Sequence, residues 1–162
     1  MRSKPTKSTS IKLAQDLVRF LEKRLSKKLT SVVLFGSVVR EEVKRGSDID
    51  VLIVLDFSTE EESEGLDAFF DATIDFEDTY PTDRHIHFIP FTKEEAKVTH
   101  PFYLDMVENS VIVFDRDDFV KKKLERLKER MKELGTRKVF LPDGKWYWQL
   151  KPGAKPGEEI EL

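Results

Sequence analysis

Two aspartates, Asp48 and Asp50, stand at the start of a run of apolar residues that ends at Leu55. Side chains at positions i and i+2 of a β-strand project from the same face, so an extended backbone would hold both carboxylates together, with Cα atoms roughly 6.6 Å apart. Two unneutralised carboxylates repel each other, and a shared cation removes that repulsion. The pair therefore predicts a metal site, with Mg²⁺ as the expected ion because it prefers oxygen ligands.

A Gly36-Ser37 pair precedes the aspartates and follows the apolar residues 31–35. Glycine allows a backbone to approach a phosphate closely, and amides at the start of a following helix point toward an anion. The Ser37 hydroxyl adds a donor. Together with the metal on the aspartates, this pair forms a cradle for a triphosphate. Positioning and charge stabilisation provide most of the catalysis in phosphoryl transfer, and two metal ions ~3.5–4 Å apart can supply both.

The elements that position these residues follow from the hydrophobic pattern. Buried strands are expected over 31–35 and 49–55, with a short helix over 38–44 between them. Helical spacing predicts an amphipathic helix over 10–28 and another over 60–75. The inner stripe of the second helix is expected to be Leu66, Phe69, Phe70 and Ile74.

The second half of the chain continues the alternation of helices and strands. Strands are expected over 84–91 and 110–114, short helices from a capping box at Thr92 and from Pro101, and a charged helix over 117–134. A hairpin is expected over 139–150, with a turn at Pro-Asp-Gly. This order favours an α/β or α+β sheet.

The sequence resembles a known family at the residues that carry the chemistry. Gly36-Ser37, ten intervening residues and Asp48-x-Asp50 resemble the signature of the minimal nucleotidyltransferases of the DNA-polymerase-β superfamily. The resemblance covers about residues 30–115 and is strongest over 34–55. It implies a nucleotidyltransferase fold of the α/β (α+β) class, in which helices flank a mixed sheet. It also implies transfer of NMP from an NTP to a hydroxyl acceptor.

The resemblance assigns roles to particular side chains. It implies that Asp48 and Asp50 are catalytic and bind the metal. Nucleotide binding is assigned to Gly36, Ser37, Arg40 and Ser47. Arg40 matches the arginine of the Gly-Ser-x-x-Arg element and has a second interpretation as a salt-bridge partner of nearby acids. Glu41 departs from the family pattern, in which glycine commonly follows.

One further departure concerns the third carboxylate. Active members generally carry an acid on a later strand beside the aspartate strand, but the strand expected over 84–91 offers His85 and His87 on one face and Ile86 and Phe88 on the other. His87 therefore stands where the acid is expected and is the third catalytic candidate. It is either a general base or a ligand that favours Mn²⁺, or the second metal is lost and the domain only binds nucleotide.

Composition restricts the remaining classes of function. The 28 basic and 31 acidic residues give a net charge of −3, whereas a protein that binds nucleic acid through its overall field is usually basic. No cysteine is present, which excludes disulfides and thiolate zinc sites, and no apolar run approaches the ~20 residues that span a bilayer. The protein is expected in the cytoplasm, with a disordered tail over 1–9, a nucleotidyltransferase domain over 10–115 and a helix-and-hairpin extension over 116–162 packed on the same domain.

Two main classes of function stay open, and a small-molecule nucleotidyltransferase of the antibiotic-modifying kind is less favoured, because no second domain that would form an acceptor pocket is evident. The first is a metal-dependent nucleotidyltransferase that uses an NTP, ATP by preference. Small members of the family resemble antitoxins that AMPylate a helical HEPN-type partner, which makes such a protein the expected acceptor. The alternative is a non-catalytic nucleotide-binding or protein-interaction module that has lost the third carboxylate. The aromatic residues of the hairpin, Trp146, Tyr147 and Trp148, are expected to pack on the core, with a partner surface as the other interpretation.

Overall fold

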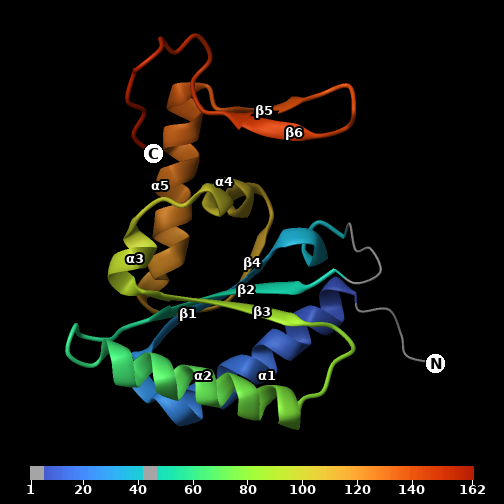
Figure 1. Cartoon of the computed structure of the whole chain (residues 1–162), viewed down its shortest axis with the longest axis vertical. Coiled ribbons are helices and arrows are strands. Elements are labelled where there is room, and N and C mark those ends of the chain that lie inside the picture. The colour runs from blue at the N-terminus through green and yellow to red at the C-terminus, as the bar shows by residue number, and fades with distance from the viewer. Residues whose placement is uncertain (1–5, 42–46) are drawn as a thin grey trace.

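A four-stranded mixed sheet forms the centre of the computed structural model, which describes residues 6–41 and 47–162 (Figure 1). The sheet has the order β3-β2-β1-β4. Its strands are β1 (Leu29–Phe35), β2 (Ile49–Leu55), β3 (Ile86–Thr92) and β4 (Ser110–Asp115). β2 and β3 are parallel, whereas β1 is antiparallel to both β2 and β4. The mixed sheet expected from the sequence is confirmed.

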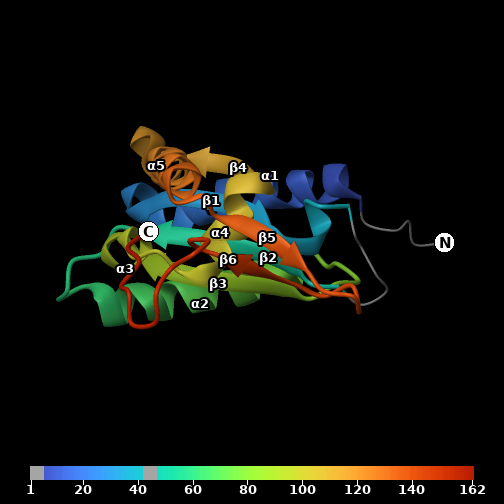
Figure 2. The same ribbon diagram turned by 90° about the horizontal axis from the view of Figure 1, so that it is seen from above.

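Helices cover both faces of this sheet (Figure 2). The helices are α1 (Lys7–Leu25), α2 (Glu62–Thr79), α3 (Lys93–Lys97), α4 (Pro101–Glu108) and α5 (Phe119–Leu134). The 3-10 turns are η1 (Ser26–Lys28), η2 (Gly36–Val38) and η3 (Arg116–Asp118). α1 and α2 lie on one face, and α4 and α5 on the other (Figure 1). A separate hairpin of β5 (Arg137–Phe140) and β6 (Trp146–Gln149) lies beyond α4.

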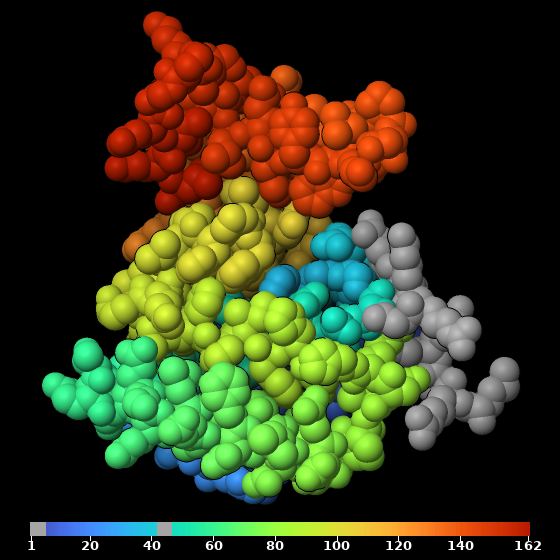
Figure 3. Space-filling view, viewed as in Figure 1, coloured from blue at the N-terminus to red at the C-terminus, as the bar shows by residue number. Residues whose placement is uncertain are grey.

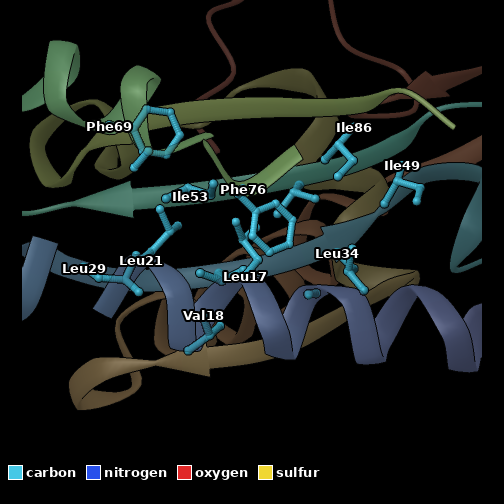
Figure 4. Close-up of a cluster of buried hydrophobic side chains, with 14 of the residues drawn as sticks. Leu17, Val18, Leu21, Leu29, Leu34, Ile49, Ile53, Phe69, Phe76 and Ile86 are labelled. Carbon is cyan, nitrogen blue, oxygen red and sulfur yellow. The ribbon is translucent and has the colours of Figure 1, made fainter. Parts of the chain in front are cut away.

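Two hydrophobic clusters are separated by the sheet. One packs α1 and α2 against side chains such as Ile49 and Ile53 of β2 (Figure 4). The other packs α4 and α5 against the alternate side chains Leu52 and Val54. Every residue of β2 except Asp50 is buried, because both faces of this central strand are covered. The uninterrupted apolar run that follows Asp50 in the sequence is therefore confirmed as a strand buried on both sides.

The N-terminal helix begins earlier than the sequence predicts. Thr6 caps α1, and its side chain accepts a hydrogen bond from the amide of Thr9, which in turn bonds back to Thr6. This reciprocal cap satisfies amides that a helix start otherwise leaves unpaired. The tail expected over 1–9 is therefore wrong for residues 7–9, which belong to α1, and residues 1–5 lie outside the described part of the chain.

The inner stripe of α2 also differs from the prediction. Its buried residues are Phe69, Ala72, Thr73 and Phe76. Phe70 and Ile74 are instead 48% and 60% exposed. The observed stripe recurs at intervals of three and four residues, so Phe70 and Ile74 lie one position away from it and cannot turn inward. Hydrophobicity alone did not choose between the two neighbouring stripes; packing against the sheet did.

The helical turn that follows β1 is shorter than the helix expected over 38–44. Gly36–Val38 forms a single 3-10 turn, closed by hydrogen bonds from the amides of Val39 and Arg40 to the Gly36 carbonyl. The end of the expected helix, residues 42–44, lies outside the described residues. The tight turn over Gly36–Val38 keeps the Gly36 backbone at the end of the sheet. The third strand also starts later than predicted, because β3 begins at Ile86 and not at residue 84.

The hairpin is fixed to α4 by a mixed polar and aromatic contact. Trp148 packs on the second cluster, and its indole N–H donates to Asp105 at 3.3 Å. The Lys138 ammonium lies 4.6 Å and 4.9 Å from the ring centres of Trp146 and Trp148 and 2.7 Å from Glu108. Trp148 thus packs as expected, while Trp146 is 38% exposed. Across the described residues, no helix combines the length and apolar character needed to cross a bilayer.

Candidate active site

Asp50 lies between the end of β1 and the neighbouring strand β3. It pairs with Phe35 in the antiparallel register and with His87 in the parallel register. This double pairing brings the turn that begins at Gly36 to one side of Asp50 and His87 to the other side. Three elements that are separate in the sequence therefore meet at one carboxylate.

Gly36 lies so close to Asp50 that no other residue fits without a shift. Its φ of +77° belongs to the left-handed region, which disfavours side chains. A Cβ atom built on Gly36 would lie 2.3 Å from the Asp50 Oδ2 atom. The backbone of the turn is thus in direct contact with the carboxylate. Such a bare backbone beside a candidate metal ligand is the arrangement that the phosphate-cradle hypothesis requires.

His87 is the hydrogen-bond partner of the other Asp50 oxygen. Its Nδ1 atom lies 3.2 Å from Asp50 Oδ1. The side chains are 56% and 28% exposed, so both can be reached from solvent. Ile86 is buried in the cluster under α1 and α2, and His87 therefore projects from the opposite face, as alternation predicts. His85 precedes β3 and is exposed, and its carbonyl accepts the Ile49 amide at 3.0 Å.

Asp48 is exposed and directly precedes β2. The buried residue between the two aspartates, Ile49, points into the first cluster. The segment before Asp48 is held by a contact that the sequence did not suggest: Arg84 donates from Nη1 to the Ser47 carbonyl at 2.6 Å. Arg84 thereby connects the start of β3 with the approach to the aspartates. An arginine before a strand has no sequence signal that separates this role from ordinary solvation.

The remaining predicted nucleotide-binding residues occupy the turn after β1 and the approach to β2. Ser37 lies in η2, and Arg40 follows it, with its amide bonded to the Gly36 carbonyl. Ser37, Arg40 and Ser47 are all half-buried. The structure therefore places Asp50 in contact with Gly36 on one side and with His87 on the other. The other candidates lie on the turn after β1 and on the segment before β2.

The candidate site opens on the face of the sheet that carries α4 and α5. Phe35, Leu52 and Ile89 lie on this face in the second cluster, and Asp50 and His87 continue it toward the end of the sheet. The hairpin projects from the same side of the sheet, above η2 in Figures 1 and 3. Asp50 and His87 are thus on an accessible end of the sheet and not within a closed core.

The side chains at this end suit a divalent cation that is also held by a substrate. In the described ranges, no three His, Asp or Glu side chains approach closely enough to form a metal cluster by themselves. Mg²⁺ is usually bound through one or two carboxylates together with substrate phosphates and water. Asp48 and Asp50 offer such a pair, and the Gly36 backbone leaves Asp50 Oδ2 without a covering side chain. These two residues would hold the ion.

Comparison with known families agrees with this geometry. The nucleotidyltransferase domain family matches residues 15–140, which include both aspartates, the Gly36 turn and His87. The chain belongs to this family. Nucleotidyltransferases of this family generally use divalent metals. The resemblance that the Gly-Ser and Asp-x-Asp spacing indicated is thus confirmed, and the matched region of the nucleotidyltransferase extends beyond the expected boundary at residue 115 into β5.

One solved structure shows the same fold at low sequence identity, and two toxin–antitoxin structures are more distantly similar. The spectinomycin adenyltransferase AAD(9) from Enterococcus faecialis, solved with ATP and spectinomycin, is 14% identical, with a TM-score of 0.52 over 80% of this chain and 67% of that chain. A toxin–antitoxin structure with AMP-PNP is 14% identical over 75% of this chain and 92% of its own, with a TM-score of 0.46. The Shewanella oneidensis tri-AMPylated HEPN toxin in complex with MNT antitoxin is 12% identical over 80% of this chain and 93% of its own, with a TM-score of 0.42. No curated protein matches the chain.

Proposed function

We propose that this nucleotidyltransferase transfers a nucleoside monophosphate, AMP by preference, from an NTP to a hydroxyl group of a protein. The observation that supports it most directly is the position of Asp50, between the Gly36 backbone and His87 at an open end of the sheet. A structural aspartate would not require a glycine beside it, whereas here an added Cβ at position 36 would lie 2.3 Å from the Asp50 Oδ2 atom. A carboxylate that shares a cation with a phosphate lying on that backbone does require such a glycine.

The reaction forms one bond and breaks one. The acceptor oxygen bonds to the α-phosphorus of the NTP, the bond between that phosphorus and the bridging oxygen to the β-phosphate breaks, and pyrophosphate leaves. The proton of the acceptor hydroxyl must pass to a base. In this proposal Asp48 and Asp50 hold the divalent cation, which supplies charge neutralisation of the phosphates. Gly36, Ser37, Arg40 and Ser47 position the triphosphate.

His87 is assigned the role of the missing third carboxylate. It contacts Asp50 through Nδ1, so its other ring nitrogen is available to an acceptor hydroxyl or to a metal. Imidazole suits softer divalent ions than Mg²⁺ does. The proposal is therefore that Mn²⁺ supports transfer at least as well as Mg²⁺.

A protein acceptor is favoured by the surface beside the site. Tyr147, Phe140 and Leu141 of the hairpin are 49%, 69% and 43% exposed, and the hairpin lies on the face toward which Asp50 and His87 point. Exposed aromatic side chains are common at the centres of protein interfaces. We place the reaction in the cytoplasm and expect a tyrosine of a helical HEPN-type protein as the acceptor. The antitoxin names of the solved neighbours belong to those proteins, and for this chain antitoxin function is part of the proposal.

The test incubates the full chain with each α-labelled NTP in Mg²⁺ and separately in Mn²⁺, with a lysate of the source cells and with a purified HEPN-type protein. The variant is Asp48→Asn with Asp50→Asn, which keeps the side-chain shape and removes the charge. The matched control is Asp56→Asn, because Asp56 follows the other end of β2 and pairs with Lys93 at 2.8 Å. Wild type and Asp56→Asn are expected to label one acceptor, and the double variant to label none.

Two results would contradict this proposal in different ways. If the double variant labelled the acceptor as fast as wild type, the site would be misassigned. If no label appeared in either metal while calorimetry showed ATP binding that the double variant loses, the chain would be a nucleotide-binding module without transfer. Mass analysis of a labelled acceptor would identify the modified side chain.

A further inference from the structure

A cavity of about 590 Å³ lies at the other end of the sheet, between α5 and the segment that joins α3 to α4. Its lining includes Lys97 and Thr99 on one side and Lys123, Arg126 and Arg130 of α5 on the other. β3 runs in parallel register with β2 from the site end, where His87 faces Asp50, to Thr92, where α3 begins. Lys97 and Thr99 follow the far end of β3, so this side of the cavity is separated from His87 by the length of the strand.

The lining of this cavity is strongly basic in a chain whose net charge is −3. Five lysines and arginines line it, and Asp117 is the one acidic side chain in its lining. Two of the five have carboxylate partners: Lys97 pairs with Glu94, and Arg130 pairs with Glu133. Within the described part of the chain, Lys122, Lys123 and Arg126 have no carboxylate within ion-pair distance. Three positive charges thus remain uncompensated around one cavity.

Lys123 is the clearest sign that an anion belongs here. It is half-buried, and its ammonium donates to the Lys97 carbonyl at 2.8 Å and lies 4.7 Å from the centre of the Tyr103 ring. Burial lowers the pKa of Lys123, because removing an ammonium from water without a counter-ion is unfavourable. A carboxylate partner would offset that penalty, but the oxygens that the ammonium contacts, those of the Lys97 carbonyl and the Thr99 hydroxyl, are neutral. A bound anion would supply the missing charge.

The spacing of cations along α5 points in the same direction. Lys122, Arg126 and Arg130 follow one another at intervals of four residues and line the same cavity. Like charges at this spacing lie side by side on a helix and destabilise it. This row of cations borders the cavity, so an anion seated there would face all three of them.

The other part of the lining is apolar. Phe119, Leu127 and Leu162 contribute to the wall, and Thr99 donates through its hydroxyl to the Leu162 carbonyl at 3.2 Å. The volume lies within the range of roughly 300–1,000 Å³ that small-molecule sites occupy. A ligand that matches both halves has a doubly charged anionic group and a flat or apolar organic part. A long nucleic acid would need a continuous basic track, which a bounded cavity does not provide.

We propose that this cavity binds a small organic phosphate of nucleotide size, separately from the candidate active site. Lys122, Lys123 and Arg126 hold its phosphate, and its organic part lies against Phe119 and Leu127. The site is distinct in chemistry from the acidic end of the sheet: it binds phosphate through cationic side chains and needs no metal.

Titration calorimetry in excess chelator tests this site apart from the metal-dependent one. The probes are AMP and inorganic phosphate, added to the full chain and to the Asp48→Asn, Asp50→Asn double variant. Arg126→Gln is the main substitution, since Arg126 is exposed and its loss does not disturb packing; Lys123→Met is the second. Lys128→Gln is the matched control, because Lys128 is an exposed cation of α5 that does not line this cavity.

The expected result is that AMP binds without metal and more tightly than inorganic phosphate. Arg126→Gln and Lys123→Met each weaken AMP binding by about tenfold, the loss of one charge-assisted contact, while Lys128→Gln and the double aspartate variant bind as wild type does. No AMP binding at about 1 mM would overturn the proposal. Equal losses of AMP binding in Arg126→Gln and Lys128→Gln would also overturn it, as would loss of AMP binding in the aspartate variant. The proposal would likewise fail if inorganic phosphate bound as tightly as AMP, or if a single-stranded oligonucleotide displaced AMP at a lower concentration than AMP itself requires.

Discussion

Where β1 ends and β2 begins, Asp50 lies between the Gly36 backbone and His87, whereas at the opposite end Lys123 and Arg126 face a cavity with no carboxylate partner among the described residues. The acidic end is assembled mainly from one short stretch of sequence, residues 36–50, completed by one neighbouring strand. The basic end collects residues from α3, α5 and the last residue of the sequence. A site of the first kind can be predicted from spacing, and a site of the second kind needs the packed fold.

The largest expected effect comes from Gly36→Ala, which acts at the acidic end alone. The new Cβ would lie 2.3 Å from Asp50 Oδ2, so the carboxylate or the turn must move. Transfer to the acceptor is expected to fall by about a hundredfold or more, because displacements near 1 Å at a reacting centre have effects of that size. The positive φ adds a loss of about 1–2 kcal/mol in the free energy of unfolding.

Gly153→Ala is the matched control for this change. Gly153 has a φ of +77°, and no atom lies within 4 Å of the position that its Cβ would take, so the substitution introduces the same backbone strain without a steric neighbour. Its unfolding free energy should fall similarly while transfer stays at the wild-type rate. Equal loss of transfer in both variants would mean that position 36 requires glycine because of backbone strain and not because of the contact with Asp50. AMP binding at the basic end should be unchanged in both.

A smaller effect is expected from Arg84→Met. Removing the donor to the Ser47 carbonyl loosens the segment that leads to Asp48, and transfer is expected to slow by about tenfold. Steady-state kinetics and urea unfolding measure the two consequences separately. Arg137→Met is the control, because Arg137 makes a comparable contact at 3.0 Å to Gln149 within the hairpin. Unchanged transfer in Arg84→Met would limit Arg84 to a role in stability.

A change of metal preference is expected from His87→Asp. An oxygen ligand beside Asp50 suits Mg²⁺ better than imidazole does, so the ratio of transfer in Mg²⁺ to transfer in Mn²⁺ should rise by about tenfold. His85→Asp is the control, since it adds the same charge at an exposed position just before β3. If both variants gave the wild-type ratio, His87 would not be a metal ligand, and its proposed role would narrow to that of a base.

The smallest effect is expected at the basic end, from Thr99→Val. Loss of the hydroxyl contact to the Leu162 carbonyl should lower the unfolding free energy by about 1 kcal/mol. It should also weaken AMP binding several-fold by releasing one wall of the cavity, without any change in transfer. Thr136→Val is the control, because Thr136 donates at 2.6 Å to the Leu150 carbonyl, away from the cavity lining. If AMP binding weakened in both variants, the loss could not be attributed to the contact between Thr99 and Leu162.

The sequence predicted the elements of the fold better than their contacts. β2 extends over the predicted residues, and the capping box at Thr92 starts α3 as expected, since both signals are local. The exposed Phe70 shows the limit: the predicted stripe on α2 is the more apolar one, and packing against the sheet nevertheless buries Ala72 and Thr73 in its place. The roles assigned to the site residues remain predictions that the transfer experiments test.

The Gly-Ser turn, the paired aspartates before a strand buried on both faces, and the family could all be predicted from the sequence, because they depend on spacing along one short stretch. The folded chain was needed to show that His87 contacts Asp50, that Arg84 holds the Ser47 carbonyl, and that cations of α5 converge with Lys97 on one cavity. The physical reason is that strand pairing and helix packing join residues whose separation in the sequence carries no periodic signal. Charge neutralisation across such contacts is therefore visible only once the chain is folded.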